Sequence, residues 1–369
     1  MKLTDVVNRI NGNVDRFTTD LEYYIGGEHF DSNELEVTKK GILKENLGKL
    51  GFKFHFAFQD RDVIFMARNP HLRKAGMVRF SGLCSDASYI LRSKDESVIT
   101  QDYLAILLQS DHFWNYCESH KVGSVNFANN WTSIANYEFE LPSIKYQKEI
   151  SKKVWAAYRL KKSYKKLLSA TEEMVKSQFI EMFGNTVTND KGWATLPIKD
   201  VAPESPCKEK QKGKVWVLNL DMIESNSGKV IEKVYEEDSN LLSVSPFDEG
   251  NVLYSKLRPY LNKVVIPEGK GYATTELVPL RPNKEFLNLT FFSHLLRGND
   301  FVTYANSISS GTKMPRMPLN DLRKFPCILP PLEEQMEFEK IAQQADKSGF
   351  ELRKSIDAID AVIKCLINN

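Results

Sequence analysis

The pattern of apolar and polar positions divides this chain into two similar halves. Each half opens with mixed sequence, in which short β-rich runs alternate with turns and short amphipathic segments. Each half then ends in a long stretch with apolar residues at 3-and-4 spacing, from Ser143 to Phe183 and from Pro331 to the chain end. Shorter helices are predicted at Gln101–Leu108 and Leu289–Leu296. The fold class is therefore predicted to be α+β, with mixed domains and two long helices.

Two runs in the second half predict strands, at Val252–Tyr254 and Lys263–Ile266. The proline- and glycine-containing segment 267–270 follows them and predicts a hairpin turn. The same segment contains Glu268 and Lys270. With Asp248 upstream, it loosely fits the nuclease pattern of an acidic residue followed by Glu-x-Lys. The turn is the better interpretation, because both flanking runs are β-rich.

The two halves are repeats of each other. Leu107–Tyr116 matches Leu295–Tyr304 at an offset of 188 residues, and both segments begin with Leu-Leu. The same offset places Gly123 on Gly311, and upstream it becomes 189. A one-residue change over so long a stretch is a single loop deletion, so the chain is predicted to contain one duplicated unit.

The two long helices are predicted to pair with each other in an antiparallel coiled coil. Their apolar positions form one stripe each, and their charges are complementary, since the first helix is mainly basic and the second mainly acidic. The stripes contain Ile150, Val154, Ala157, Tyr164, Leu168, Thr171, Val175 and Met182 in the first helix, and Phe338, Ile341, Ala345, Leu352, Ile356, Ile359, Ile363 and Leu366 in the second.

Composition narrows the protein class without identifying a partner. With 50 basic and 48 acidic residues the net charge is +2, so any basic surface must come from local segregation. The first residues lack the apolar core of a signal peptide, and no run is long enough for a membrane span. The five scattered cysteines favour neither a disulfide framework nor a zinc site. We expect a cytoplasmic protein with reduced thiols.

Motifs for catalysis are missing from the sequence. An adenine methyltransferase needs an Asn-Pro-Pro-aromatic motif, and Asn69-Pro70-His71-Leu72 lacks the second proline and the aromatic residue. Neither a glycine-rich dinucleotide loop nor a phosphate-binding loop is present, and the six histidines lack metal-ligand spacing. The prediction is a non-catalytic protein without its own cofactor or metal.

Three motifs resemble the specificity subunit of type I restriction–modification systems. Gly250–Lys263 is similar to that family's run ending in Leu-Arg-Pro-Tyr-Leu-Asn-Lys. Leu329–Gln335 is similar to its Leu-Pro-Pro-Leu-x-Glu-Gln entry into each long helix. Ser310–Thr312 is similar to its glycine loop. The first repeat departs from these patterns, with Asn69 in place of the usual Arg and 143–146 in place of Pro-Leu-x-Glu.

The resemblance implies an architecture and a set of partners. Target recognition domains would occupy 1–142 and 186–330, and conserved spacer helices 143–185 and 331–369. Each domain would read one half of an asymmetric, bipartite double-stranded DNA site. The helices would dock a methyltransferase subunit, in two copies, and a motor-nuclease subunit would join for phage defence. S-adenosylmethionine, ATP and Mg would be bound by those partners, which methylate adenine and cleave DNA.

The candidate DNA contacts are basic, aromatic and small polar residues around the proline turns and the glycine loops. Lysine and arginine suit phosphates, whereas hydroxyl and amide side chains suit base edges. In the second repeat they are Lys256, Arg258, Tyr260, Lys263, Thr312, Lys313 and Arg316. In the first they are Arg68, His71, Arg73, Lys74, Ser124, Asn126 and Asn129.

Other interpretations remain open at this stage. The basic face of the first long helix could meet DNA, meet a partner or be solvated; its residues are Lys152, Lys153, Lys161, Lys162, Lys165 and Lys166. The chain could serve a related phage-defence complex with a different effector. It could also be a coiled-coil scaffold whose two domains bind protein.

Overall fold

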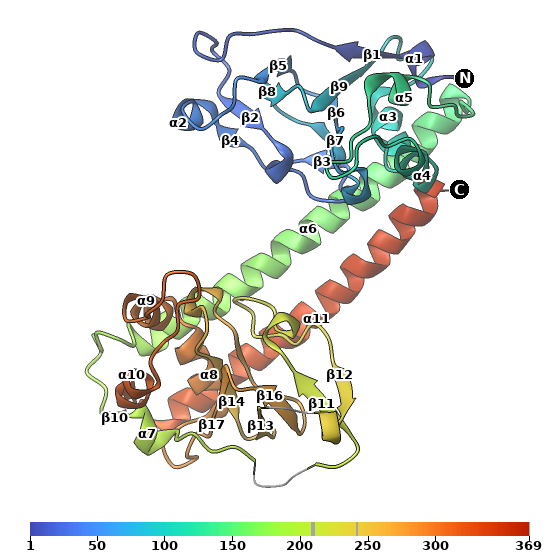
Figure 1. Cartoon of the computed structure of the whole chain (residues 1–369). Helices are drawn as coiled ribbons and strands as arrows, with labels where there is room; N and C mark the ends of the chain where they lie inside the picture. Colours follow the sequence, from blue (N-terminus) through green and yellow to red (C-terminus); the bar gives the residue numbers. More distant parts are fainter. Residues whose placement is uncertain (208–210, 241–242, 369) are drawn as a thin grey trace. The chain divides into compact units, whose positions relative to one another are not determined.

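The computed structural model describes residues 1–207, 211–240 and 243–368, which form two compact units. Unit 1 contains Met1–Lys166 and the chain from Arg353 onward, whereas unit 2 contains Leu167–Leu352. Each unit has an α+β domain and part of two long helices, α6 (Ile144–Phe183) and α11 (Leu332–Asn368) (Figure 1). The sequence analysis gave the long helices boundaries of their own, apart from the domains. In the structure, each long helix is divided between the two compact units.

The domain of unit 1 contains two mixed sheets. The first is ordered β1-β9-β6-β7-β3 and the second β4-β2-β8-β5. The strands of the first sheet are β1 (Val7–Ile10), β9 (Ser88–Ser93), β6 (Val63–Met66), β7 (Ala75–Val78) and β3 (Glu36–Val37). Those of the second are β4 (Gly41–Ile42), β2 (Tyr23–Ile25), β8 (Gly82–Ser85) and β5 (Phe54–Phe58). Parallel pairs β2–β8 and β3–β7 make both sheets mixed.

Short helices cover the first sheet of unit 1 (Figure 1). They are α1 (Leu3–Val6), α3 (Gln101–Leu107), α4 (Asp111–Ser119) and α5 (Trp131–Ala135), with α2 (Leu43–Asn46) beside the second sheet. Side chains alternate across a strand, so fully buried β6 faces two cores. Val63 and Phe65 pack with α3 and α4, whereas Ile64 and Met66 pack toward β2 and β8.

The domain of unit 2 is also built from small sheets, but its described strands form three sheets where those of unit 1 form two. Its sheets are ordered β12-β11-β16-β13, β15-β14-β17 and β10-β18. Their strands are β10 (Thr195–Pro197), β11 (Lys214–Leu218), β12 (Val234–Glu237), β13 (Val244–Phe247), β14 (Val252–Ser255), β15 (Val264–Val265), β16 (Gly271–Thr274), β17 (Leu277–Leu280) and β18 (Pro326–Ile328). Its helices are α7 (Ile198–Val201), α8 (Leu289–Arg297), α9 (Asn299–Ser307) and α10 (Leu319–Lys324).

The structure confirms the predicted strands and short helices, but it contradicts the hairpin. Segment 267–270 joins β15 to β16, and these strands belong to different sheets. The segment is therefore a crossover between two layers, which local composition cannot distinguish from a hairpin. Asp248 pairs with Arg281 and Glu268 with Lys233, so these acids have structural partners.

Within each unit, segments of both long helices contribute apolar side chains to the core of the domain. In unit 1, Ile150 and Val154 of α6 share a core with Ile363 of α11 and the helices α3 and α4. In unit 2, Val175 of α6 shares a core with Phe338 of α11. α6 ends at Gly184, whose φ of +71° suits a left-handed helix stop.

The charge pairing differs from the sequence-based prediction. Lys161 of α6 does pair with Asp360 of α11, at 2.6 Å. The same lysine also pairs with Glu34, at 3.1 Å, and Lys162 binds Glu36 at 2.7 Å. Part of the basic face of α6 is therefore neutralised by its own domain, because Glu34 and Glu36, at the start of β3, lie against it.

None of the helices in the described ranges combines the length and apolar character that crossing a membrane requires. The same ranges contain no cluster of three or more His, Cys, Asp or Glu side chains placed to hold a metal ion.

Candidate nucleic-acid interface

The two segments singled out in the second repeat lie side by side in unit 2. After β14, the backbone turns through a short 3-10 helix, η5 (Pro259–Leu261), between two left-handed residues, Arg258 and Asn262. The amide of Arg258 donates to the Pro315 carbonyl at 2.7 Å, which joins this turn to the glycine loop. Residues far apart in the sequence thus form one surface.

The same arrangement occurs in unit 1. A 3-10 helix, η2 (Pro70–Leu72), lies between left-handed Asn69 and Arg73, and the Asn69 amide donates to the Phe127 carbonyl at 2.8 Å. The loop glycines also match, since Gly123 has φ +106° and Gly311 has φ +105°. Both values favour glycine, because a Cβ there is strained. The duplication predicted from the sequence is therefore present in the backbone.

Several predicted contacts are available to a ligand in unit 2. Tyr260, Thr312 and Lys313 are exposed, and Lys256 and Arg258 are partly exposed. Within the part of the chain that the structure describes, the Arg258 Nε is buried without a hydrogen-bond partner. A buried guanidinium nitrogen without an acceptor carries a desolvation cost.

Two predicted contacts point into the protein. Lys263 Nζ donates to the Leu220 carbonyl at 2.6 Å, and its counterpart Lys74 donates to the Gly27 carbonyl at 2.7 Å. Each lysine ties its proline turn to an earlier 3-10 helix, η3 (Leu220–Met222) or η1 (Gly27–His29). We therefore assign these lysines to the framework of the turn.

In unit 1 the exposed candidates are Arg68, His71, Ser124 and Asn126. Arg73 binds Asp111 at 2.5 Å, which holds it against the start of α4. Asn129 is 1% exposed, and its Nδ2 donates to the Cys117 carbonyl at 2.7 Å. Because its amide is used inside the core, Asn129 does not belong to the surface that a ligand meets.

Glu276 is a residue of this region that the sequence analysis missed. It lies just before β17, and its carboxylate binds the guanidinium of Arg316 on the glycine loop, with Oε1 at 2.9 Å from Nη2. This carboxylate raises the pKa of Arg316, which therefore stays charged. A single glutamate between two threonines and a run of apolar residues does not by itself indicate a binding site. Only the repeat alignment, which places Ala87 opposite Glu276, marks the position as different.

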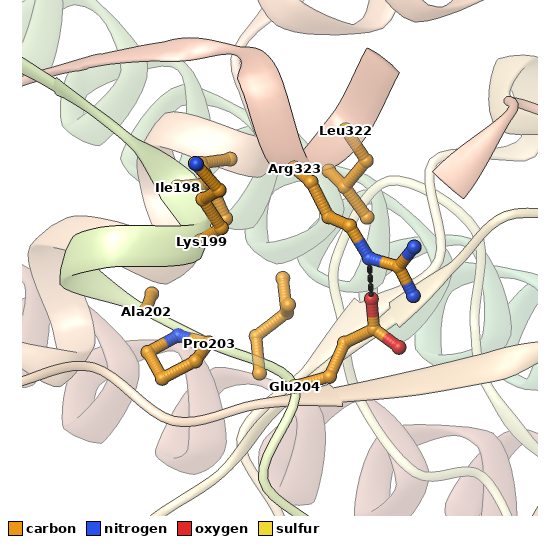
Figure 2. A pocket seen from close by; sticks show the side chains of 8 residues that line it. Ile198, Lys199, Ala202, Pro203, Glu204, Leu322 and Arg323 are labelled. Atoms are coloured by element: carbon orange, nitrogen blue, oxygen red, sulfur yellow. Dashed lines mark hydrogen bonds and ion pairs between the residues drawn. The ribbon is translucent and has the colours of Figure 1, made fainter. Parts of the chain in front are cut away.

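Unit 2 also has an open pocket of about 370 Å³, shown in Figure 2. It is lined by Ile198, Lys199, Ala202, Pro203, Glu204, Leu280, Leu322 and Arg323. The Arg323 Nε donates to Glu204 at 2.6 Å beside it. None of the predicted DNA contacts lines this pocket, so we treat it as separate from the candidate interface.

Comparison with known proteins gives one family. Residues 190–359 match the model of the type I restriction modification DNA specificity domain. The specificity subunit of the type I restriction enzyme EcoDI from Escherichia coli is 31% identical over 136 residues. That match covers 37% of this chain and 30% of the relative, so it spans less than a third of the relative's length.

Two solved structures have the same fold. The type I restriction-modification S subunit from M. genitalium gives a TM-score of 0.57 at 11% identity, covering 100% of this chain and 94% of that chain. A chain from a structure on complex assembly and conformational transition of the type I system gives 0.55 at 17% identity, covering 100% and 95%. Residues 190–359 are thus similar to the type I restriction modification DNA specificity domain, and the chain shares the fold of these two solved structures.

Proposed function

We propose that this chain is the non-catalytic DNA-recognition subunit of a type I restriction–modification complex. Its two domains would read the two different halves of an asymmetric, split DNA site. The observation that carries this proposal is the twice-repeated turn and glycine loop, with equivalent backbone hydrogen bonds and different side chains. A shared frame with different residues suits two domains that bind the same kind of polymer but read different sequences.

The charges and shapes of the exposed residues support duplex DNA as the ligand. Lys256, Arg258 and Lys313 would contact phosphates in unit 2, and Arg68 would do so in unit 1. The exposed Thr312, Ser124 and Asn126 carry groups that bond base edges in the major groove. Tyr260 would add an aromatic face beside these cations.

An apolar stripe on α6 supports a protein partner. Leu160, Leu167 and Met174 recur every seven residues and are 45%, 52% and 49% exposed. A heptad of large exposed side chains is typical of a helix that packs against another helix. We propose that it docks the methyltransferase subunit, in two copies, and that a motor-nuclease subunit joins for cleavage. S-adenosylmethionine, ATP and Mg would belong to those partners.

Methylation-sensitive sequencing of DNA from cells that carry this chain with its methyltransferase partner tests the proposal. The expected result is methylated adenine within one split, asymmetric motif. Methylation without a motif, or no methylation when both proteins are present, would contradict it. Sequencing also gives the length of the spacer between the half-sites.

A protein-binding scaffold is the alternative that the stripe on α6 also allows. The double change Arg258→Ala with Lys313→Ala separates the two, since it removes two cations from the proposed DNA surface and leaves α6 unchanged. Recognition predicts weaker DNA binding and a less negative slope of log K against log salt, by about one per lost phosphate contact. If the chain is a protein-binding scaffold, the wild type and the double variant should bind DNA equally.

A further inference from the structure

The repeated frame allows the side chains of the two domains to be compared position by position. In unit 2 the Lys256 amide donates to the Glu276 carbonyl at 3.1 Å, and in unit 1 the Ala67 amide donates to the Ala87 carbonyl at 2.9 Å. Each pair is separated by the same offset in the repeat. Lys256 and Glu276 therefore stand where the first domain has two alanines.

The glycine loops give a third matched position. Arg316 exchanges two backbone hydrogen bonds with Ser310, at 2.9 and 3.1 Å, and Ala128 exchanges two with Val122, at 2.9 and 2.8 Å. Arg316 thus stands where the first domain has another alanine. Since the first domain builds the same loop without this arginine, the frame itself does not require the Arg316–Glu276 pair.

The geometry of the pair leaves part of the arginine free. Arg316 presents one edge to Glu276, through Nε at 3.1 Å and Nη2 at 2.9 Å from Oε1. A guanidinium has five N–H groups, so the two on Nη1 and one on Nη2 remain. The Arg316 side chain is still 46% exposed, whereas Glu276 is 23% exposed. The carboxylate therefore orients an arginine whose outer end can meet a ligand.

We propose that Arg316, oriented by Glu276, reads a guanine in the half-site of the second domain. This inference rests on the proposed function and adds a specificity-determining residue and its positioning residue to it. A guanine presents O6 and N7 in the major groove, and two parallel N–H groups of arginine match them. The alanines of the first domain cannot make this contact, so its half-site is read by other residues.

The carboxylate argues against phosphate as the ligand of Arg316. An acid beside a phosphate-binding arginine lowers the local attraction for DNA, whereas an acid beside a base-reading arginine holds it in one orientation. The two ligands therefore predict opposite signs for Glu276→Gln. Loss of the acid should raise affinity for every duplex if Arg316 binds phosphate, and should weaken base discrimination if it reads guanine.

The experiment uses the full chain with its methyltransferase partner. Binding is measured to a set of duplexes in which each base pair of the methylation-defined site is replaced in turn. For Arg316→Lys, which keeps the charge but loses the planar fork, we expect discrimination at one G·C pair of one half-site to fall roughly 5- to 150-fold. Glu276→Gln should lower discrimination at the same pair, with no gain in affinity for scrambled duplexes.

A second pair in the same domain provides a matched control. Arg323 and Glu204 make a similar ion pair, 44% and 29% exposed, at the pocket of Figure 2. The changes Arg323→Lys and Glu204→Gln should leave discrimination at every base pair as in the wild type. Thermal unfolding of all four variants separates a folding defect from a change in recognition.

Several outcomes would overturn this inference. One is a target in which the half-site of the second domain has no guanine. Another is an unchanged base preference in both Arg316→Lys and Glu276→Gln, with or without a lower unfolding temperature. In that case the ion pair would only hold the loop to the domain. A uniform rise in affinity for Glu276→Gln would assign Arg316 to phosphate. A wild-type complex with no sequence preference would instead refute the proposed function itself.

Discussion

At the scale of single residues, burial separates the predicted DNA contacts into surface and framework. Lys263 and Lys74 look like exposed cations in the sequence, yet both ammonium groups bind backbone carbonyls of an earlier turn. Asn129 follows a glycine loop but lies in the core, with its Nδ2 on the Cys117 carbonyl. Residue type and spacing indicate the region of a site, but they do not tell which way a side chain points.

His294 gives a residue-scale prediction on pH. Burial and the neighbouring Arg297 guanidinium lower the pKa of His294 to about 3, so the folded protein holds this ring neutral. The unfolded chain takes up the proton near pH 6.5, so the stabilising effect of the neutral ring is complete above that pH and is lost as pH falls. The free energy of unfolding should drop by up to about 1.4 kcal/mol per pH unit between pH 6 and 4.

Urea unfolding at several pH values checks this slope. The variant His294→Gln has no titrating ring, so it should lose less stability over the same acidic range. His71, which is exposed, provides the control: His71→Gln should keep the wild-type slope. Equal slopes for all three proteins would show that His294 does not carry the effect.

At the scale of elements, the sequence predicted where the long helices begin and end, but it missed some of the residues that they bury. The 3-and-4 spacing predicted α6 and α11 nearly to their observed ends, because helical period depends only on local sequence. Trp155 and Tyr158 were missed, although both are buried against the first domain. Trp155 donates to the Asp102 carbonyl, and Tyr158 lies beside Glu34. Both partners are distant in the sequence, so no local pattern could have revealed the burial.

Lys161 gives a prediction at this scale, because it links three elements. It is 5% exposed and bridges Glu34 and Asp360. Although burial alone would raise the pKa of Glu34, hydrogen bonds and charge from Lys165 and Lys161 lower it. Replacing Lys161 by Met would leave Glu34 with Lys165 as its remaining cation, and we expect a loss of about 1–3 kcal/mol in unfolding free energy at neutral pH.

Lys152→Met is the matched control, since Lys152 is exposed on the same helix and its loss should change stability by less than about 0.5 kcal/mol. The lowered pKa of Glu34 also fixes the sign of the pH effect. The contribution of this carboxylate is complete above its unfolded pKa and is lost as pH falls through the lower folded value. The difference between Lys161→Met and wild type should therefore shrink in acid, and a constant difference would contradict the assignment.

At the scale of the whole molecule, one chain contains two copies of the same recognition frame. A dimer of identical chains reads a palindrome, because symmetry repeats every contact. Here the matched positions carry Ala67, Ala87 and Ala128 in one domain and charged residues in the other. Fusion of two diverged copies removes the symmetry requirement, so the two half-sites of the proposed target are free to differ.

This asymmetry predicts that changes in one domain affect one half-site. Arg68→Ala should weaken binding to duplexes in which only the half-site of the first domain is intact, and Arg258→Ala should do so for the other half-site. Competition between duplexes with one scrambled half measures both effects in the full complex. If either variant weakened both classes of duplex equally, independent reading by the two domains would be wrong.

The sequence by itself determined the features that depend on period and repetition. Helical spacing predicted α6 and α11, and the 188-residue offset predicted two copies of one domain with its turn and glycine loop. Tertiary structure decided which cations are free, where segment 267–270 leads, and that the lysines of α6 pair with Glu34 and Glu36. It also brought Glu276 to Arg316, forty residues away. The physical reason is that periodicity is written in neighbouring residues, whereas burial and ion pairing depend on segments that meet only in the folded chain.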